Sequence, residues 1–327
     1  MRSKHICTTL SKRCKMKKID FHVHIETALP VKQSAYYFKD MCERHGYSGI
    51  NILAFCYRLE DNKGFYEKCN EAALELKEEM GDGSYAFCCL LPEKDFAKQA
   101  EYYMSNGFDG IKLLRGGKPN YYKNFPYLYD HEIYENFFAL AEEKQYPIIM
   151  HNNDPAYSWD ISKAPERAIK MGWVYDDSVP THDRYYQSVD NILERHPNLK
   201  IAMAHMGFYS ENIDKAFDMM EKYPNLYMDM TPALNIYEEL SLIRDRAEEF
   251  FLKHGDRIFF GTDATNHLVG EARMYNDKKN TVTSHFFGGG EYKEVCGKRI
   301  SPVRLPKEIL ENIYYNNAMR FIGKEIK

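Results

Sequence analysis

Eight short apolar runs, roughly 25–50 residues apart, alternate along this chain with longer segments whose apolar residues recur every three or four positions. Such alternation is typical of parallel βα units. A count of eight favours a closed α/β barrel, the (β/α)8 or TIM-barrel fold, over an open sheet, and 327 residues is a normal length for it. The predicted strands are residues 19–24, 49–55, 85–91, 110–114, 147–151, 200–205, 226–230 and 257–263.

The barrel is predicted to form one domain over residues 18–327, with insertions at 152–186 and 264–303. Long irregular segments inside a compact domain are usually functional, so the first insertion is expected to contact a substrate. Residues 1–17 are rich in Lys and Arg and lack an apolar stretch. They are therefore expected to form a tail outside the fold, disordered or preceding a native start at Met16.

Composition argues against several classes of partner. The formal net charge is −4 and the basic residues are scattered, so nucleic acid is not an expected partner. No apolar run approaches the ~20 residues needed to span a bilayer, so no membrane interaction is expected. The eight cysteines include no CxxC pair. That pattern suits reduced thiols, so a cytoplasmic protein without disulfides is predicted.

The first predicted strand contains two histidines that are two positions apart. Side chains with this spacing project from one face of a strand and lie ~7 Å apart along it. Asp20, His22 and His24 are therefore expected to share one face. Phe21 and Val23 would then pack on the opposite side. Neutral imidazoles bind zinc-like cations, but histidines with this spacing also occur at ordinary surfaces.

Three further predicted strands end in residue types that bind metals. The fifth, sixth and eighth strands close with His151, His205 and Asp263. In an α/β barrel the C-terminal ends of the strands meet at one mouth, where the active site lies. A single histidine at a strand end is more often structural. Four strands that end in ligand residues at the same mouth indicate a metal site instead.

Several short motifs follow one another in a recognisable order. They are HxH at His22 and His24, the histidine after PIIM, AHMG around His205, FGTD ending at Asp263, and ILENIYYNNAMRFIG at residues 309–323. With these motifs the chain resembles the amidohydrolase superfamily of metal-dependent barrel hydrolases. The resemblance is to the branch that includes aminocarboxymuconate-semialdehyde-type decarboxylases, and it covers nearly the whole chain from Met16 onward.

The resemblance implies one divalent metal ion per chain, with Zn²⁺ expected, and the ligands that match are His22, His24, His151 and Asp263. It also implies that His205 binds a second metal, or polarises the substrate and handles protons. Two-metal members bridge their ions with a carboxylated lysine, and Lys112 is near that position. Because GIKL also occurs in one-metal members, one ion is favoured, and Lys112 could equally form an ion pair within the mouth.

Such a site predicts a metal-dependent hydrolase. A bound zinc-type ion lowers the pKa of its water to ~7 and so supplies hydroxide at neutral pH. Asp263 is expected to accept the proton of that water and pass it to the leaving group. Carboxylates behind the imidazoles should orient them, with Asp20 and Asp229 as candidates. The expected substrate is an amide, ester or lactone of a small anionic molecule.

Four residues are candidates for substrate contact. Arg115, at the end of the fourth strand, could bind a substrate carboxylate. Asn153, Asp154 and Trp159 follow His151 in the first insertion. The alternative interpretation is that Arg115 is solvated and that Trp159 packs the insertion onto the rim.

Two other functions fit the same residues. The first is non-oxidative decarboxylation, or hydration, of a small unsaturated or aromatic carboxylic acid. The second is a non-catalytic barrel that holds a metal in a filled coordination sphere. The predicted partner is a small-molecule substrate, and because barrels of this kind often pair through surface helices, a homodimer is the expected assembly.

Overall fold

The computed structural model describes residues 16–25, 29–55, 63–92, 95–231, 234–266 and 270–326. The predicted tail at residues 1–15 lies outside these ranges. The strands are β1 (Ile19–Ile25), β2 (Gly49–Ala54), β3 (Tyr85–Cys89), β4 (Gly110–Leu113), β5 (Ile148–Met150), β6 (Ile201–Met203), β7 (Leu226–Asp229), β8 (Ile258–Phe259), β9 (Ala264–Thr265), β10 (Lys293–Val295) and β11 (Lys298–Ile300).

A ring of parallel strands forms the centre of the molecule. Nine strands pair in the order β8-β7-β6-β5-β4-β3-β2-β1-β9. β8 lies within the predicted eighth strand, residues 257–263, and β9 directly follows it; β8 pairs with β7 and β9 pairs with β1. Between them, the N–H of Phe21 donates to the Phe260 carbonyl at 3.0 Å, and the N–H of Asp263 donates to the His22 carbonyl at 2.9 Å. These bonds close the ring and confirm the predicted (β/α)8 barrel.

Gly261 lies at the point of closure, between β8 and β9. A Cβ at this position would come within 2.6 Å of Thr231 Cγ2 and 3.1 Å of His22 Cβ. Only a residue without a side chain permits this close approach to β1 and to the end of β7.

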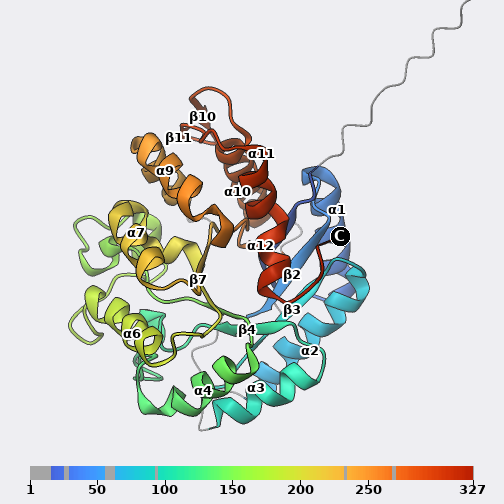
Figure 1. The fold of residues 1–327 in the computed structure, drawn as a ribbon, viewed down its shortest axis with the longest axis vertical. Helices are drawn as coiled ribbons and strands as arrows, with labels where there is room; N and C mark the ends of the chain where they lie inside the picture. The colour runs from blue at the N-terminus through green and yellow to red at the C-terminus, as the bar shows by residue number, and fades with distance from the viewer. Residues whose placement is uncertain are drawn as a thin grey trace, which may run out of the picture.

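Helices surround the barrel (Figure 1). They are α1 (Val31–His45), α2 (Lys63–Met80), α3 (Phe96–Ser105), α4 (Glu135–Lys144), α5 (Glu166–Lys170), α6 (His182–Arg195), α7 (Ile213–Lys222), α8 (Leu234–Leu242), α9 (Arg244–His254), α10 (Gly270–Gly288), α11 (Lys307–Glu311) and α12 (Asn317–Phe321). The 3-10 segments are η1 (Pro119–Tyr121), η2 (Glu132–Tyr134), η3 (Ala156–Trp159), η4 (Ala204–Glu211) and η5 (Gly255–Arg257), and η6 (Asn312–Asn316) is a π-helical segment.

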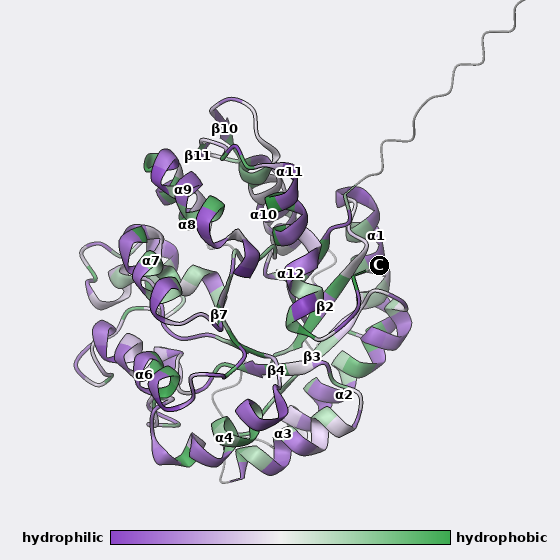
Figure 2. Cartoon of the chain, viewed as in Figure 1, coloured by the Kyte–Doolittle hydropathy of each residue, from purple (hydrophilic) through white to green (hydrophobic). Residues whose placement is uncertain are grey.

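The helices are amphipathic, which explains why they pack around the strands. In α7 the buried residues Ile213, Ala216, Phe217 and Met220 recur every three or four positions and so form one apolar stripe. Figure 2 shows hydrophilic residues along the surrounding helices and hydrophobic residues on inner strands such as β2.

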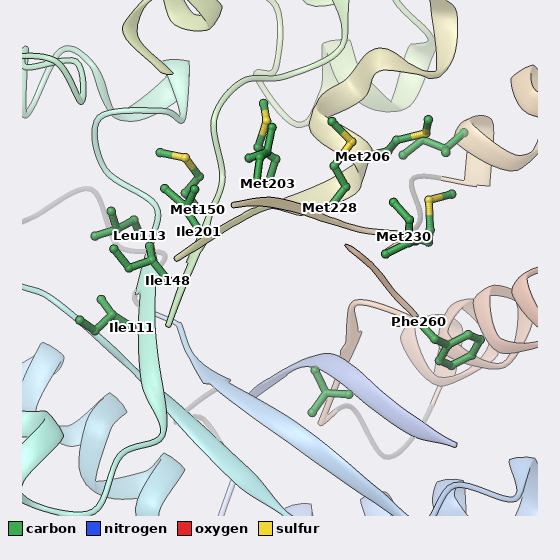
Figure 3. Close-up of a cluster of buried hydrophobic side chains, with 14 of the residues drawn as sticks. Ile111, Leu113, Ile148, Met150, Ile201, Met203, Met206, Met228, Met230 and Phe260 are labelled. Carbon is green, nitrogen blue, oxygen red and sulfur yellow. The ribbon is translucent and has the colours of Figure 1, made fainter. Parts of the chain in front are cut away.

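The larger apolar cluster lies between the strands and the helices. Figure 3 shows side chains that neighbouring strands contribute to it, among them Ile111 from β4, Ile148 from β5, Ile201 from β6 and Met228 from β7. Alternate residues along each strand face this layer, since successive side chains point to opposite faces of a sheet. The remaining positions face the barrel interior.

The smaller apolar cluster fills the interior beneath the mouth. The ring of Phe21 packs there against those of Phe87, Phe259 and Phe321, with centroids 5.8, 4.9 and 6.2 Å apart. Phe321 belongs to α12, so the C-terminal helix closes this end of the barrel. We refer to this group as the aromatic floor.

Phe21 was expected to share a face with Val23, opposite His22 and His24, and this prediction was wrong. Val23 does pack in the outer cluster, but Phe21 lies in the interior one. The pairing of β1 with β2 shifts register between Asp20 and Val23. A bulge of this kind interrupts the alternation of side chains, so Phe21 and the next residue, His22, both face the interior.

The two predicted insertions differ in structure. The segment 152–186 contains η3, α5 and the first turn of α6, which begins at His182. The Gly-rich polar segment 264–303 contains β9, the 19-residue helix α10 and the antiparallel β10–β11 hairpin. The domain boundaries themselves stay a prediction. Among the described residues, no helix is both long and apolar enough to cross a bilayer.

Candidate metal centre

Three potential ligand atoms converge at the mouth of the barrel. Nε2 of His22 and Nε2 of His24 lie 3.1 Å apart. Oδ1 of Asp263 lies 3.7 Å from the first and 3.2 Å from the second. All three atoms lie within 4.8 Å of one another, close enough to share one cation. β1 supplies both histidines, and the break between β8 and β9 supplies Asp263, whose φ of +54° turns the chain there.

The hydrogen bonds behind the two imidazoles fit a metal ion. Nδ1 of His22 lies 2.7 Å from Oδ2 of Asp229, and Nδ1 of His24 lies 3.4 Å from the Leu53 carbonyl oxygen. Both oxygens can only accept, so a proton on each Nδ1 satisfies them and leaves a lone pair on each Nε2. In that tautomer, the two Nε2 atoms and the carboxylate of Asp263 are three acceptor atoms that face one another. A divalent cation stabilises such an arrangement.

Asp229, at the end of β7, connects several groups of the site. Besides His22, it accepts hydrogen bonds at Oδ1 from the N–H of His205 (2.8 Å), from the N–H of Thr231 (3.1 Å) and from the Thr231 hydroxyl. Burial acts to raise the pKa of Asp229, but the facing imidazole of His22 outweighs burial and holds that pKa below its usual range. Asp229 is therefore ionised and lies where an orienting carboxylate is needed.

Asp20 was also predicted to orient an imidazole, and the structure contradicts this. Its carboxylate accepts hydrogen bonds from the N–H of Thr262 at 2.9 Å, from the Thr262 hydroxyl and from the backbone N–H of His22 at 3.4 Å. The reason is the bulge in β1, which turns Asp20 away from the mouth. Burial raises the pKa of Asp20 to about 7.

His205 lies beside these residues and is held by an unusual turn. Residues 205–208 have φ between +53° and +59°, a left-handed conformation that is costly for residues with a side chain. The ring centroid of His205 lies 5.5 Å from that of His22 and 5.0 Å from that of His151. Nδ1 of His205 lies 2.9 Å from the hydroxyl and 3.4 Å from the carbonyl of Thr231, so Nε2 is left for the mouth.

His151, predicted as a ligand of the same metal, lies outside the three-atom group. Its Nε2 lies 3.2 Å from Oδ1 of Asp154, which leaves Nδ1 to face the mouth. Burial lowers the pKa of His151 to about 4, so the imidazole is neutral at pH 7. Asp154 is itself buried and also accepts hydrogen bonds from Lys118 and Tyr175. The structure therefore places Asp154 behind His151 and not in an open pocket for substrate.

Two buried cations line a pocket next to His24. Lys112 and Arg115 are 3% and 5% exposed, and they share the pocket with Phe55, whose ring centroid lies 4.6 Å from that of His24. Nε of Arg115 donates to the Tyr66 hydroxyl at 3.2 Å, so the interpretation of Arg115 as a solvated residue was wrong. Nζ of Lys112 has no hydrogen-bond partner among the described residues, and burial lowers its pKa to about 8.

The other two candidates for substrate contact hold the first insertion together. Nδ2 of Asn153 donates to the His182 carbonyl at 3.1 Å. Nε1 of Trp159 donates to the Pro180 carbonyl at 3.0 Å, and its ring packs against those of Tyr175 and His182. The alternative interpretation of Trp159, that it packs the insertion onto the rim, describes these contacts.

Sequence reasoning missed two residues that contact the site. Thr231 lies two positions beyond β7, a strand-end location that could have identified it. Lys279 lies on α10, and no local pattern connects it with Asp263, sixteen positions earlier. Its Nζ donates to the Asp263 carbonyl and lies 3.5 Å from Oδ2. Burial acts to raise the pKa of Asp263, but Lys279 and His24 hold that pKa well below its usual range.

A closed α/β barrel with a His-His-Asp cluster at its mouth is the architecture of a metal-dependent barrel enzyme. A family model described as amidohydrolase matches residues 19–324. The match covers nearly the whole chain, and the protein belongs to this family. The resemblance indicated by the motifs is thereby confirmed. No curated protein sequence matches the chain.

Solved structures with this fold include both decarboxylases and a hydrolase. The 2,6-dihydroxybenzoate decarboxylase from Rhizobium matches with a TM-score of 0.56 and 14% identity, over 94% of this chain and 99% of that one. Dihydroorotase from Campylobacter jejuni gives 0.54 and 12%, over 95% and 84%. The 5-carboxyvanillate decarboxylase from Novosphingobium aromaticivorans, in complex with manganese, gives 0.54 and 10%, over 94% and 96%. At these identities the likeness shows the fold alone.

Proposed function

We propose that this protein is a metal-dependent hydrolase that acts on an amide, ester or lactone bond of a small anionic molecule. The observation that carries the proposal is the convergence of His22 Nε2, His24 Nε2 and Asp263 Oδ1, three potential ligand atoms close enough to share one cation. His151 would be the fourth ligand through Nδ1. Zn²⁺ is the proposed ion because imidazole and carboxylate ligands suit it.

One ion per chain is proposed, and a second ion held by His205 and Lys112 is the alternative. The buried Lys112 has no hydrogen-bond partner among the described residues, so its Nζ is available to either arrangement. Metal content per chain separates the two.

The ion would supply two functions: when bound, it lowers the pKa of water and polarises a carbonyl oxygen. The protein's own residues would move the protons. Asp263 is ionised and its side chain is 28% exposed at the mouth, which supports a role for its carboxylate in accepting a proton and returning it to the leaving group. For His205, the hydrogen bond from Nδ1 to Thr231 supports acceptance of a proton at Nε2 over polarisation of a carbonyl.

The substrate is proposed to carry a carboxylate that lies between Lys112 and Arg115. Both cations are buried and line the pocket beside His24, and an arginine fork matches a carboxylate. Arg115→Ala is expected to raise the KM for an acidic substrate by about tenfold or more, since a hydrogen bond to a charged group contributes about 1.5–3 kcal/mol. The KM for an uncharged ester is the matched control. An unchanged KM for the acid would exclude this role.

The second candidate is non-oxidative decarboxylation of a small carboxylic acid. It is favoured by the same pocket, in which Lys112 and Arg115 lie among the aromatic side chains of Phe55, Tyr66 and Phe96. An acid bound there would lie beside His24.

The test begins with the metal content of protein purified without added metal. A panel of esters, lactones, amides and carboxylic acids then separates the candidates, because hydrolysis gives an acid while decarboxylation releases CO₂. His24→Ala should lose both the metal and the turnover. Protein that takes up no divalent metal would overturn the proposal. A metal-loaded protein that converts no member of the panel would favour the non-catalytic metal-holding barrel.

A further inference from the structure

Helix α10 places a row of buried polar side chains against the segment that carries Asp263. Asn276 and Lys279 are 2% and 3% exposed, although they belong to a polar insertion. Nδ2 of Asn276 donates to the Thr265 carbonyl at 2.8 Å, and Nζ of Lys279 donates to the Asp263 carbonyl. An ammonium group that is removed from water requires partners of this kind. One face of α10 therefore holds the backbone on both sides of Ala264.

Lys279 also contacts the side chain of Asp263. Its Nζ lies 3.5 Å from Oδ2, whereas Oδ1 lies 3.2 Å from Nε2 of His24 and 3.7 Å from Nε2 of His22. The two carboxylate oxygens thus have different neighbours. The left-handed φ of +54° at Asp263 is uncommon for a residue with a side chain and needs support from its surroundings.

We propose that Lys279 is a positioning residue for the metal centre: by binding the carbonyl and Oδ2 of Asp263, it directs Oδ1 alone toward His22 and His24. The proposal rests on the proposed function, since it requires that Asp263 is a metal ligand. Without Lys279 the carboxylate is free to rotate and to offer both oxygens to one ion. The insertion 264–303 would then be part of the metal centre, and not only a cover for the barrel.

A purely structural role for Lys279 makes a different prediction. If the lysine only anchors α10, its loss should lower the free energy of unfolding of the metal-free protein. The affinity for metal and the geometry of the bound ion should then stay as in the wild type. Measurements on bound cobalt distinguish the roles, because the visible absorption of Co²⁺ weakens as its coordination number rises from four.

The experiment compares Lys279→Met with Lys278→Met, the exposed neighbour on the same helix. Each full-length protein is stripped of metal and titrated with Co²⁺, and both the dissociation constant and the visible spectrum are recorded. Lys279→Met is expected to bind cobalt about 10–100-fold more weakly, as is usual when a partner behind a metal ligand is lost, and to give a weaker absorption band. Lys278→Met should match the wild type.

An affinity and a spectrum that are unchanged in Lys279→Met would overturn the proposal. If that variant does not fold, Lys279→Gln retains a donor for the carbonyl but removes the charge beside Oδ2, and the same two outcomes apply to it. Wild-type protein that takes up no cobalt would overturn the metal centre and this proposal with it. A wild type that binds cobalt, combined with variants that bind it equally well, overturns the role of Lys279 alone.

Discussion

The barrel interior contains two layers of opposite character. In the aromatic floor, Phe21 packs on the rings of three other phenylalanines. In the layer above, His22 and His24 lie with Asp263 in a cluster of potential ligand atoms that are close enough to share one cation. Phe21 and His22 are neighbours in the sequence. The difference shows that one strand, β1, supplies both a ring that packs in the barrel interior and side chains that can bind a metal.

The largest expected effect on stability comes from a substitution in the aromatic floor. Phe21→Ala removes a fully buried ring and should lower the free energy of unfolding by about 3–5 kcal/mol. The folded fraction should still bind metal as the wild type does, because the acceptor atoms are in the other layer. Urea unfolding and a metal titration in the absence of urea measure the two effects. A folded Phe21→Ala protein with no metal affinity would show that the layers are not independent.

A substitution in the layer above the floor should have the opposite result, a large loss of metal binding with a smaller loss of stability. His24→Ala removes one ligand atom, and its loss should weaken metal binding by more than about a hundredfold, beyond the effect of losing an orienting partner. The free energy of unfolding of the metal-free protein should change less than in Phe21→Ala, since the imidazole of His24 lies at the mouth and its Nδ1 makes a long, 3.4 Å contact with the Leu53 carbonyl. A chelator should lower the Tm of the wild type but not that of His24→Ala.

Asp229→Asn sharpens the comparison within the upper layer. The amide has nearly the same shape, but if it donates to Nδ1 of His22, the imidazole proton moves to Nε2 and the lone pair for the metal is lost. Metal affinity should fall by about 10–100-fold. Asp20→Asn is the matched control, because Asp20 bonds to Thr262 instead of an imidazole. Equal losses in the two variants would contradict the role assigned to Asp229.

The smallest expected effect is the change with pH in the free energy of unfolding of the metal-free protein. Burial lowers the pKa of His22 and of His151 from 6.5 to about 4, so the unfolded chain binds protons first as the pH falls. The free energy of unfolding should therefore decrease between pH 6.5 and about 4. The pKa of Asp20 is raised from 3.8 to about 7, so protonation of Asp20 stabilises the folded protein as the pH falls. This effect opposes that of the two histidines, but it comes from a single group. Urea unfolding at several pH values measures the slope, and stability that increases toward pH 4 would contradict it.

Much of the site could be predicted because it follows a local rule. The C-terminal ends of barrel strands meet at one mouth, so His22, His24, His205 and Asp263 could be brought together from their positions in the sequence alone. Asp229 ends β7 and could be found in the same way. The rule failed for Asp20 and Phe21, because a register shift in β1 depends on the neighbouring strand and leaves no local signal.

Other features depended on contacts between distant segments. Lys279 reaches Asp263 only because α10 packs against the closure of the barrel. The left-handed turn at residues 205–208 is supported by the hydrogen bond from the N–H of His205 to Asp229, a residue 24 positions away. Asp154 was expected at the substrate, but its contacts with Lys118 and Tyr175 place it behind His151.

The sequence by itself determined the barrel and the identity of the residues at its mouth, because periodicity along a strand or helix is a local property. Only the tertiary structure decided which nitrogen of each histidine faces the centre, and which oxygen of Asp263 meets it. Those choices depend on the hydrogen-bond partners behind each group. The partners come from β7, from the end of β2 and from α10, far away along the chain.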